Sequence, residues 1–417
     1  MRARGVLRDA DFRKLWAGMT VSKLGTSVAS LAAPLIAVQV LDASAFEVSL
    51  LFAAVWVPWL VIGLPAGAWI DRVARKPVML LSDVASAAVA ISVPIAAGLG
   101  HLTMIHLLLA ALLLGTGAMF FQIAWTAYLP AMFDQEDLVG ANSVLQGTES
   151  AAQVAGPAIG GVLISAVTAV AGMVVDALSF LVSAFALWRI RRAERRPVVA
   201  AEPATIARDI AEGARWLIRD RFLRNLTIHG AVCNLVLTAY GALVVVFLVR
   251  EVGVGTTGVG LLLAVSSLGG VAAATAVPRL VRRFGSARTM VTCKLFAGVA
   301  SLLIPMTRPG FGLILFVAGT AGVAAGVVAG NVVAGSFRQA YCPPGMLGRI
   351  VTSMQFVNLG AIPIGAVLGG ATASLVGTRS AIWVMTIAYA VAGLILLLGP
   401  LRGRRDLPTA EMALASQ

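Results

Sequence analysis

The stretch LQGTESAAQVAGPAIGG (145–161) is repeated 209 positions later as MQFVNLGAIPIGAVLGG (354–370). The identical positions include the pairs Gln146/Gln355, Gly156/Gly365, Gly160/Gly369 and Gly161/Gly370. Both stretches are apolar and rich in glycine. The first contains the carboxylate of Glu149, whereas the second has the neutral Asn358 at the equivalent position. A repeated segment of this length indicates an internal duplication of the chain.

Two further pairs of segments support the duplication. DRVARKPVM (71–79) aligns with RRFGSARTM (282–290) at an offset of 211, and DFRKL (11–15) aligns with RFLRN (221–225) at an offset of 210. Because three matches have nearly the same offset, we predict two parallel repeats of about 210 residues each.

The composition places these repeats in a lipid bilayer. Hydrophobic residues make up 59% of the chain and charged residues 12%, whereas soluble domains have roughly 25% charged residues. Twelve apolar stretches are long enough for transmembrane helices. They are 13–41, 48–70, 78–99, 102–126, 141–166, 170–188, 225–249, 258–280, 289–307, 311–337, 350–375 and 380–400. We expect an all-α polytopic membrane protein with two pseudo-symmetric halves of six helices, related by an axis along the membrane normal.

The long polar segment 189–222 separates the two halves, so we predict an N-terminal half at 1–188 and a C-terminal half at 223–417. Within the linker, TIARDIAEGARWLIRDR (205–221) has an apolar face and a charged face. The apolar positions are Ile206, Ile210, Ala214 and Leu217. This pattern predicts an amphipathic helix at the cytoplasmic interface; a helix that binds a regulatory partner is the alternative.

The net charge of +13 follows the membrane topology. With the N-terminus inside, the inner segments hold 27 lysines and arginines, and the outer loops hold only Arg250, Arg308 and Arg379. This is the positive-inside pattern, which predicts that both termini are cytoplasmic. The basic excess therefore does not indicate a nucleic-acid partner.

Signs of other protein classes are absent from the sequence. The three cysteines, Cys233, Cys293 and Cys342, lie at unrelated depths, so no disulfide or metal site is expected. No phosphate-binding loop, zinc-protease motif or nucleophile elbow is present, and we expect neither an enzyme nor a cofactor. The N-terminus lacks the pattern of a cleaved signal peptide. Abundant alanine, glycine and arginine suggest a GC-rich bacterial genome.

Four segments resemble those of the major facilitator superfamily, and the resemblance extends over essentially the whole chain. GAWIDRVARK (67–76) resembles that superfamily's loop between spans 2 and 3, with Ala74 where glycine is usual. AGPAIGG (155–161) resembles the end of the fifth-span motif of drug–proton antiporters. EGARWLIRDRFLRNL (212–226) and PPGMLGR (343–349) are similar to segments of the macrolide-efflux and enterobactin-exporter branch. The resemblance implies the major facilitator fold and an efflux carrier that works by alternating access.

The loop after span 2 is a candidate cytoplasmic gate. Its matching positions, with the carboxylate that supports the loop from span 3, are Gly67, Asp71, Arg72, Arg75, Lys76 and Asp83. A carboxylate beside several cations can accept hydrogen bonds from a helix N-terminus or pair with a basic side chain. Such a latch would tie the cytoplasmic helix ends together. The alternative is that these cations only set the topology.

The end of span 5 is a candidate packing and gating surface. Gly156, Gly160 and Gly161 lie on one helical face, where small residues let two membrane helices approach closely. Pro157 removes a backbone donor and bends the span. In the resembled fold this surface packs against the other half and hinders leakage. An ordinary packing seam is the alternative.

Ionisable side chains inside the spans are the candidate coupling groups. Lys23 lies in span 1, Glu149 in span 5 and Asp176 in span 6, and such groups in apolar spans normally have partners. Because spans 1 and 5 are neighbours in the resembled fold, we predict a Lys23–Glu149 pair that changes during proton-coupled transport. A permanent structural salt bridge is the alternative. Asp176 matches a family position that carries Asp or Asn, which suggests a structural hydrogen bond.

Spans 1, 4, 7 and 10 line the substrate cavity in the resembled fold. Their polar or aromatic candidates for substrate contact are Gln122, Trp125, Asn234, Tyr240 and Asn331. Helix–helix hydrogen bonds are the alternative role of these side chains. Span 4 lacks the arginine that several proton-coupled drug exporters carry there.

These features predict a monomeric secondary transporter of the bacterial inner membrane that exports small amphipathic compounds in exchange for protons. Its partners would be the substrate, protons and lipid. A dedicated exporter of a siderophore or natural product is an alternative, and so is an importer. A membrane sensor or enzyme on the same scaffold would need an added soluble domain or a catalytic cluster, neither of which the sequence contains.

Overall fold

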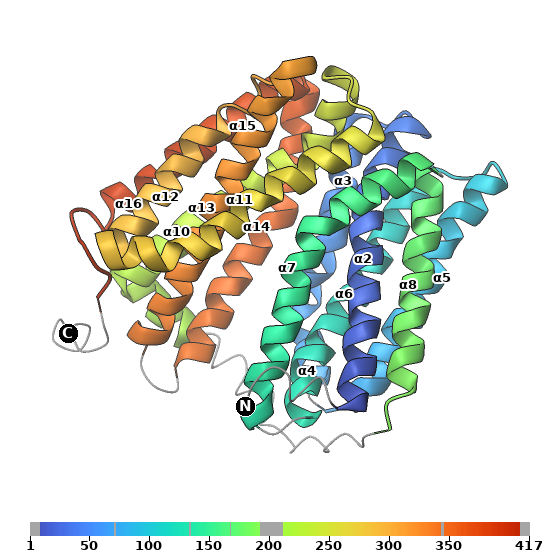
Figure 1. The fold of residues 1–417 in the computed structure, drawn as a ribbon, viewed down its shortest axis with the longest axis horizontal. Helices are drawn as coiled ribbons and strands as arrows, with labels where there is room; N and C mark the ends of the chain where they lie inside the picture. The colour runs from blue at the N-terminus through green and yellow to red at the C-terminus, as the bar shows by residue number, and fades with distance from the viewer. Residues whose placement is uncertain are drawn as a thin grey trace. The chain divides into compact units, whose positions relative to one another are not determined.

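The computed structural model describes residues 9–70, 72–132, 135–166, 168–191, 212–342 and 346–408. These ranges are predominantly helical and contain no β-strand (Figure 1). Asp71 and most of the predicted linker, residues 192–211, lie outside them. The Asp71 latch and the first turns of the amphipathic helix therefore remain predictions.

The first repeat forms six predicted spans from seven helices. They are α2 (Ala10–Gln39), α3 (Ala45–Val61), α4 (Gly63–Ile70), α5 (Arg75–Gly98), α6 (Met104–Met132), α7 (Gln135–Ala166) and α8 (Ala169–Trp188). The second predicted span is divided into α3 and α4 four residues after Pro58. Proline lacks the backbone donor that an unbroken helix uses.

The second repeat has the corresponding helices. They are α10 (Arg221–Val246), continued by a π-helical turn η1 (Phe247–Glu251), then α11 (Thr256–Phe284), α12 (Ser286–Ser301), the 3₁₀ turn η2 (Gly310–Gly312), α13 (Leu313–Tyr341), α14 (Leu347–Val376), α15 (Thr378–Ala392) and α16 (Leu394–Leu398). Residues 212–219, the end of the predicted amphipathic segment, are also helical.

Nine helices of the described ranges are long and apolar enough to cross a membrane. The other three predicted spans fall on α3 with α4, on α7 and on the 16-residue α12. Among the described residues of α7, Ala155–Ala166 forms a shorter apolar stretch. The predicted fold class, twelve spans in two halves of six, is confirmed.

Both repeats begin their first helix in the same way. The side chain of Asp9 accepts hydrogen bonds from the backbone at Asp11 and Phe12, and Asp220 accepts from Phe222 and Leu223. These caps satisfy backbone donors that the first turn of a helix leaves unpaired. A short polar residue thus defines where α2 and α10 start.

The chain forms two compact units, residues 1–201 with 255–264, and residues 202–254 with 265–417. Helix pairing inside each unit follows the repeat. In the first, α2 packs against α7 and α8, and α5 packs against α6 and α8. In the second, α10 packs against α14 and α15, and α12 packs against α13 and α15. The predicted boundaries at 188 and 222 stay predictions.

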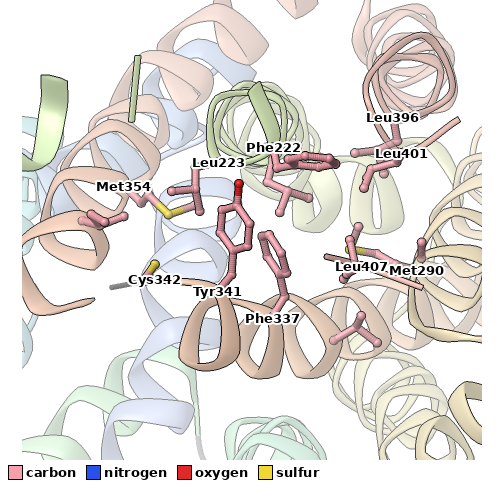
Figure 2. Close-up of a cluster of buried hydrophobic side chains, with 14 of the residues drawn as sticks. Phe222, Leu223, Met290, Phe337, Tyr341, Cys342, Met354, Leu396, Leu401 and Leu407 are labelled. Atoms are coloured by element: carbon pink, nitrogen blue, oxygen red, sulfur yellow. The ribbon is translucent and has the colours of Figure 1, made fainter. Parts of the chain in front are cut away.

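An aromatic cluster forms part of the core of the second unit (Figure 2). Phe337 and Tyr341 stack with their ring centroids 4.7 Å apart, and Phe222 meets Tyr341 edge-on at 6.0 Å. The Tyr341 hydroxyl donates to Asp220 Oδ2 at 2.6 Å, while Asp220 Oδ1 caps α10. The start of α10 and the end of α13 are therefore joined by one carboxylate.

Substituting Asp220 by alanine should destabilise the second unit. The change removes a helix cap worth about 1 kcal/mol and leaves the Tyr341 hydroxyl without its acceptor. Tyr341→Phe keeps the ring stack and leaves the cap intact, so its effect should be smaller. Thermal unfolding of both purified variants in detergent would measure the difference. A Tyr341→Phe variant as unstable as Asp220→Ala would contradict this assignment.

Candidate functional site

Lys23 on α2 and Glu149 on α7 form an ion pair in the first unit. Lys23 Nζ lies 2.9 Å from Glu149 Oε2 and 3.0 Å from Oε1. The side chains are 35% and 36% exposed, respectively. Lys23 is thirteen residues after the first residue of α2, about 20 Å along the helix at 1.5 Å per residue. Ionisable groups at such depth in an apolar span indicate a functional site.

The contacts of this pair are few. In the part of the chain that the structure describes, Glu149 has Lys23 as its only hydrogen-bond partner. The neighbouring residue Thr148 accepts a hydrogen bond from Trp16 Nε1 at 2.8 Å, which also joins α7 to α2. Among the described residues the Glu149 carboxylate is held by Lys23, and it is partly exposed.

The glycine-rich end of α7 packs directly on α2. A Cβ added to Gly156 would overlap the side chain of Ser27, and one added to Gly160 would lie 3.2 Å from Val28 Cα. The helix continues through Pro157 without a break. Glycine at these positions allows the backbones to approach closely, as expected for helix association in lipid.

Gly161 makes a second close contact inside the first unit. A Cβ on Gly161 would lie 2.8 Å from the Cα of Gly260, in the segment 255–264 at the start of α11. Two glycines therefore face each other where α7 and α11 touch. The contacts of Gly156, Gly160 and Gly161 support the predicted packing role of this helix face. Its gating role stays a prediction.

Lys76 in the predicted gate contacts the end of α8. Its ammonium donates to the backbone carbonyl of Ile190 at 2.7 Å and lies 3.5 Å from that of Trp188. Cations are favourable at helix C-termini, where carbonyl groups lack partners. Lys76 therefore ties the first turn of α5 to the last turn of α8.

The other gate candidates are spread over different environments. Gly67 has open space around it, Arg72 is exposed, and Arg75 is the first residue of α5. Asp71 lies outside the described residues. Asp83, two turns into α5, is 3% exposed, and its Oδ2 has no hydrogen-bond partner among the residues described.

Asp176 on α8 is held by hydroxyl groups. It is 2% exposed, and its Oδ1 lies 3.4 Å from Thr26 Oγ1 and 3.5 Å from Ser179 Oγ. A Cβ on Gly25 of α2 would overlap Ser179, so the two helices are in close contact here. This geometry favours the structural hydrogen-bonding role over proton transfer.

The five substrate candidates lie on helices of both units. Trp125 is 8% exposed and belongs to the apolar core of the first unit, so its bulk serves packing. Gln122 is partly buried and Asn331 is exposed. Tyr240 lines a small apolar cavity in the second unit. Asn234 donates to Asn358 Oδ1 at 3.2 Å. This is a hydrogen bond between helices, the role predicted from the sequence as the alternative to substrate contact.

A polar cluster of the second unit was not among the predicted site residues. His229 Nδ1 lies 3.0 Å from the carbonyl of Ala392, and its Nε2 lies 3.5 Å from Cys233 Sγ. Their spacing of four residues places His229 and Cys233 on one face of α10, which the sequence could have indicated. Lys294 on α12 packs against Gly330 of α13, because a Cβ added to Gly330 would lie 2.8 Å from Lys294 Nζ.

The described end of the amphipathic segment packs against α14. Glu212 forms an ion pair with Arg349 at 2.6 Å, and Gly213 lies against the backbone of Arg349. Leu217 is buried in the core of the second unit, while Arg215 and Arg219 are exposed. The predicted apolar and charged faces are both present in this turn.

Comparison with known proteins identifies the family. The family model described as transmembrane secretion effector matches residues 3–413. The chain belongs to this family of the major facilitator superfamily. The superfamily predicted from the loop after span 2 and the glycine-rich end of span 5 is thus confirmed, and the chain is a multi-pass membrane protein.

Two curated relatives of this transporter are named as efflux proteins. It is 27% identical over 402 residues to the multidrug efflux pump Tap of Mycolicibacterium fortuitum, which covers 94% of this chain and 96% of the relative. It is 22% identical over 368 residues to macrolide efflux protein A of Streptococcus pyogenes, which covers 88% and 90%.

Solved transporters share the fold at low sequence identity. A bacterial homologue of the iron transporter ferroportin in an inward-facing state has a TM-score of 0.75 and 18% identity, and covers 94% of this chain and 99% of that chain. The nucleoside transporter NupG has a TM-score of 0.70 and 11% identity, and covers 93% and 98%. These likenesses concern the fold alone.

Substituting Gly156 by alanine should weaken the contact between α2 and α7, because the new Cβ would overlap Ser27. Overpacking of this kind costs about 1–3 kcal/mol. Gly147→Ala on the same helix is the matched control, since no atom lies within 4 Å of that position. The temperature of thermal unfolding should fall for Gly156→Ala and stay at the wild-type value for Gly147→Ala. Equal stability of the two variants would contradict the packing role, and a stable but leaky Gly156→Ala protein would favour the gating role.

Proposed function

We propose that this transporter exports small amphipathic compounds from the bacterial cytoplasm in exchange for protons, by alternating access. The Lys23–Glu149 ion pair carries the proposal, because it places a titratable carboxylate deep in a membrane-spanning helix of the first unit. It would lie in the inner membrane with both termini in the cytoplasm, as the distribution of basic residues predicts. Its partners would be substrate, protons and lipid, and it would act as a monomer.

The chemistry of the pair suits proton exchange. A proton on Glu149 removes the negative charge and leaves the Lys23 ammonium without its partner, which is costly in apolar surroundings. Because each side chain is about a third exposed, solvent screens part of this cost. Protonation therefore favours a rearrangement of α2 relative to α7, and deprotonation restores the pair.

Coupling of the ion pair to the change of conformation would produce antiport. The intact pair favours one packing of α2 on α7 and a proton on Glu149 favours another, so a substrate that binds only one of the two conformations would be exchanged for the proton. Proton and substrate would then bind in turn, in opposite conformations of the transporter. A ligand shifts such an equilibrium only through different affinities for the two states. The names of the relatives, a multidrug pump and a macrolide efflux protein, support the substrate class.

Transport into proteoliposomes tests the proposal. The probes are a radiolabelled macrolide and tetraphenylphosphonium, each measured by counterflow without a gradient and by accumulation under an imposed pH gradient. A gradient of one pH unit supports about tenfold accumulation when one proton is exchanged for one monovalent cation such as tetraphenylphosphonium. Glu149→Gln should retain counterflow and lose the gradient-driven accumulation.

Asp176→Asn is the matched control, because it neutralises a second carboxylate within the spans of the first unit, one whose side-chain partners among the described residues are hydroxyl groups. It should keep the response to the gradient. Wild-type flux that ignores the gradient, or a Glu149→Gln variant that accumulates substrate like the wild type, would exclude proton coupling through Glu149.

A further inference from the structure

The contact between α2 and α7 has a neutral counterpart in the second unit. Asn234 on α10 donates from Nδ2 to Asn358 Oδ1 on α14 at 3.2 Å and lies 3.4 Å from the Asn358 carbonyl. Glu149 and Asn358 occupy equivalent positions of the sequence repeat, 209 residues apart. One residue of the ion pair, Glu149, is therefore the repeat equivalent of one residue of the amide hydrogen bond, Asn358.

The other two members are equivalent as well. Lys23 lies fourteen residues after Asp9, the cap of α2, and Asn234 lies fourteen residues after Asp220, the cap of α10. Counted from these caps, α2 relates to α10 at an offset of 211, one residue more than the 210 at which DFRKL (11–15) aligns with RFLRN (221–225), and α7 relates to α14 at an offset of 209. Both ends of the ion pair map onto both ends of the hydrogen bond.

A second contact between the same helices has the same two offsets. Gly160 of α7 lies against Val28 of α2, and Gly369 of α14 lies against Ala239 of α10. Val28 and Ala239 are 211 residues apart, while Gly160 and Gly369 are 209 apart. These two contacts between the helices therefore share one register, whereas Gly156 lies against Ser27 and Gly365 against Leu235, and Ser27 and Leu235 are 208 residues apart.

The two contacts differ in how firmly their side chains are held. Asn358 also donates to the carbonyl of Met354 at 2.7 Å. Its Oδ1 packs against Gly230, because a Cβ added to Gly230 would lie only 2.6 Å from this oxygen. Glu149, by contrast, has Lys23 as its one partner among the described residues. Asparagine has no group that titrates in the physiological range, so the contact in the second unit cannot respond to protons.

We propose that these are two versions of one cross-helix contact, that the contact needs no charge to hold its helices together, and that only the first unit exchanges a proton through it. The Asn234–Asn358 version is a fixed brace. The Lys23–Glu149 version keeps the bracing geometry and adds titration. The part concerning protons rests on the proposed function, whereas the equivalence of the two contacts does not.

The double variant Lys23→Asn/Glu149→Asn tests the inference by giving the first unit the side chains of the second. It should unfold at a temperature close to that of the wild type and catalyse counterflow of tetraphenylphosphonium. Its accumulation under a pH gradient should fall to the level reached without one. The single variants Lys23→Asn and Glu149→Asn should be less stable than the double variant, because each leaves one charge unpaired.

Asn234→Ala/Asn358→Ala is the complementary variant, which removes the brace from the second unit. Its unfolding temperature should fall, and the ratio of gradient-driven accumulation to counterflow should equal that of the wild type. A changed ratio with counterflow preserved would show that the second contact also takes part in coupling, and would overturn the inference.

The first double variant has three outcomes against the inference. Failure to fold, or folding without counterflow, would show that the contact needs its charges. A full response to the gradient would show that the charges do not couple. If instead the wild type ignores the gradient, the proposed proton antiport fails, and the stabilities of the single and double variants still decide whether the two contacts are equivalent.

Discussion

Close approach of helix backbones is the constraint on which the rest of this structure depends. In a bilayer every backbone donor and acceptor must be satisfied within the segment, so the spans are helices. Helices surrounded by lipid gain little from burying apolar side chains, and they associate through close packing and polar contacts. Here glycine supplies the packing: Gly160 lies on α2 in the first unit, and Gly369 lies on α10 in the second.

The polar contacts lie in the same seams as the glycines. Between α2 and α7 the seam holds the Lys23–Glu149 pair, and between α10 and α14 it holds the Asn234–Asn358 hydrogen bond. Close backbones bring short and long polar side chains within reach of one another, and the packing keeps their geometry. The charged seam is therefore a structural contact that contains ionisable side chains, and the proposed proton coupling depends on it.

Comparison of the two repeats indicates that the charge of the Lys23–Glu149 pair is not needed for helix packing. Two repeats with the same helix pairing would tolerate the same side chains at equivalent positions, and the second repeat shows that a neutral pair is sufficient for packing. A carboxylate in an apolar span is costly and is normally associated with function. The family relationship and the efflux activities named for its relatives agree with a role in transport.

Much of the site followed from the sequence once the repeat was recognised. The pairing of Lys23 with Glu149 could be inferred because the fold places the first and fifth spans side by side, and each residue is deep in its span. The burial of Trp125 in the core of the first unit could not be predicted, because helical periodicity does not distinguish a cavity-facing aromatic residue from one in the core. Asn358 was missed as a partner of Asn234 because hydrogen bonds between helices depend on rotamers and helix rotation.

The sequence by itself determined the membrane class, the twelve spans and the duplication, because apolar length and a repeated pattern are local properties of the chain. Only the tertiary structure decided which polar side chains meet. Whether Lys76 reaches the end of α8, or Lys294 lies over Gly330, depends on distances between segments far apart in the sequence. Those distances are set by how closely glycine lets each pair of helices approach.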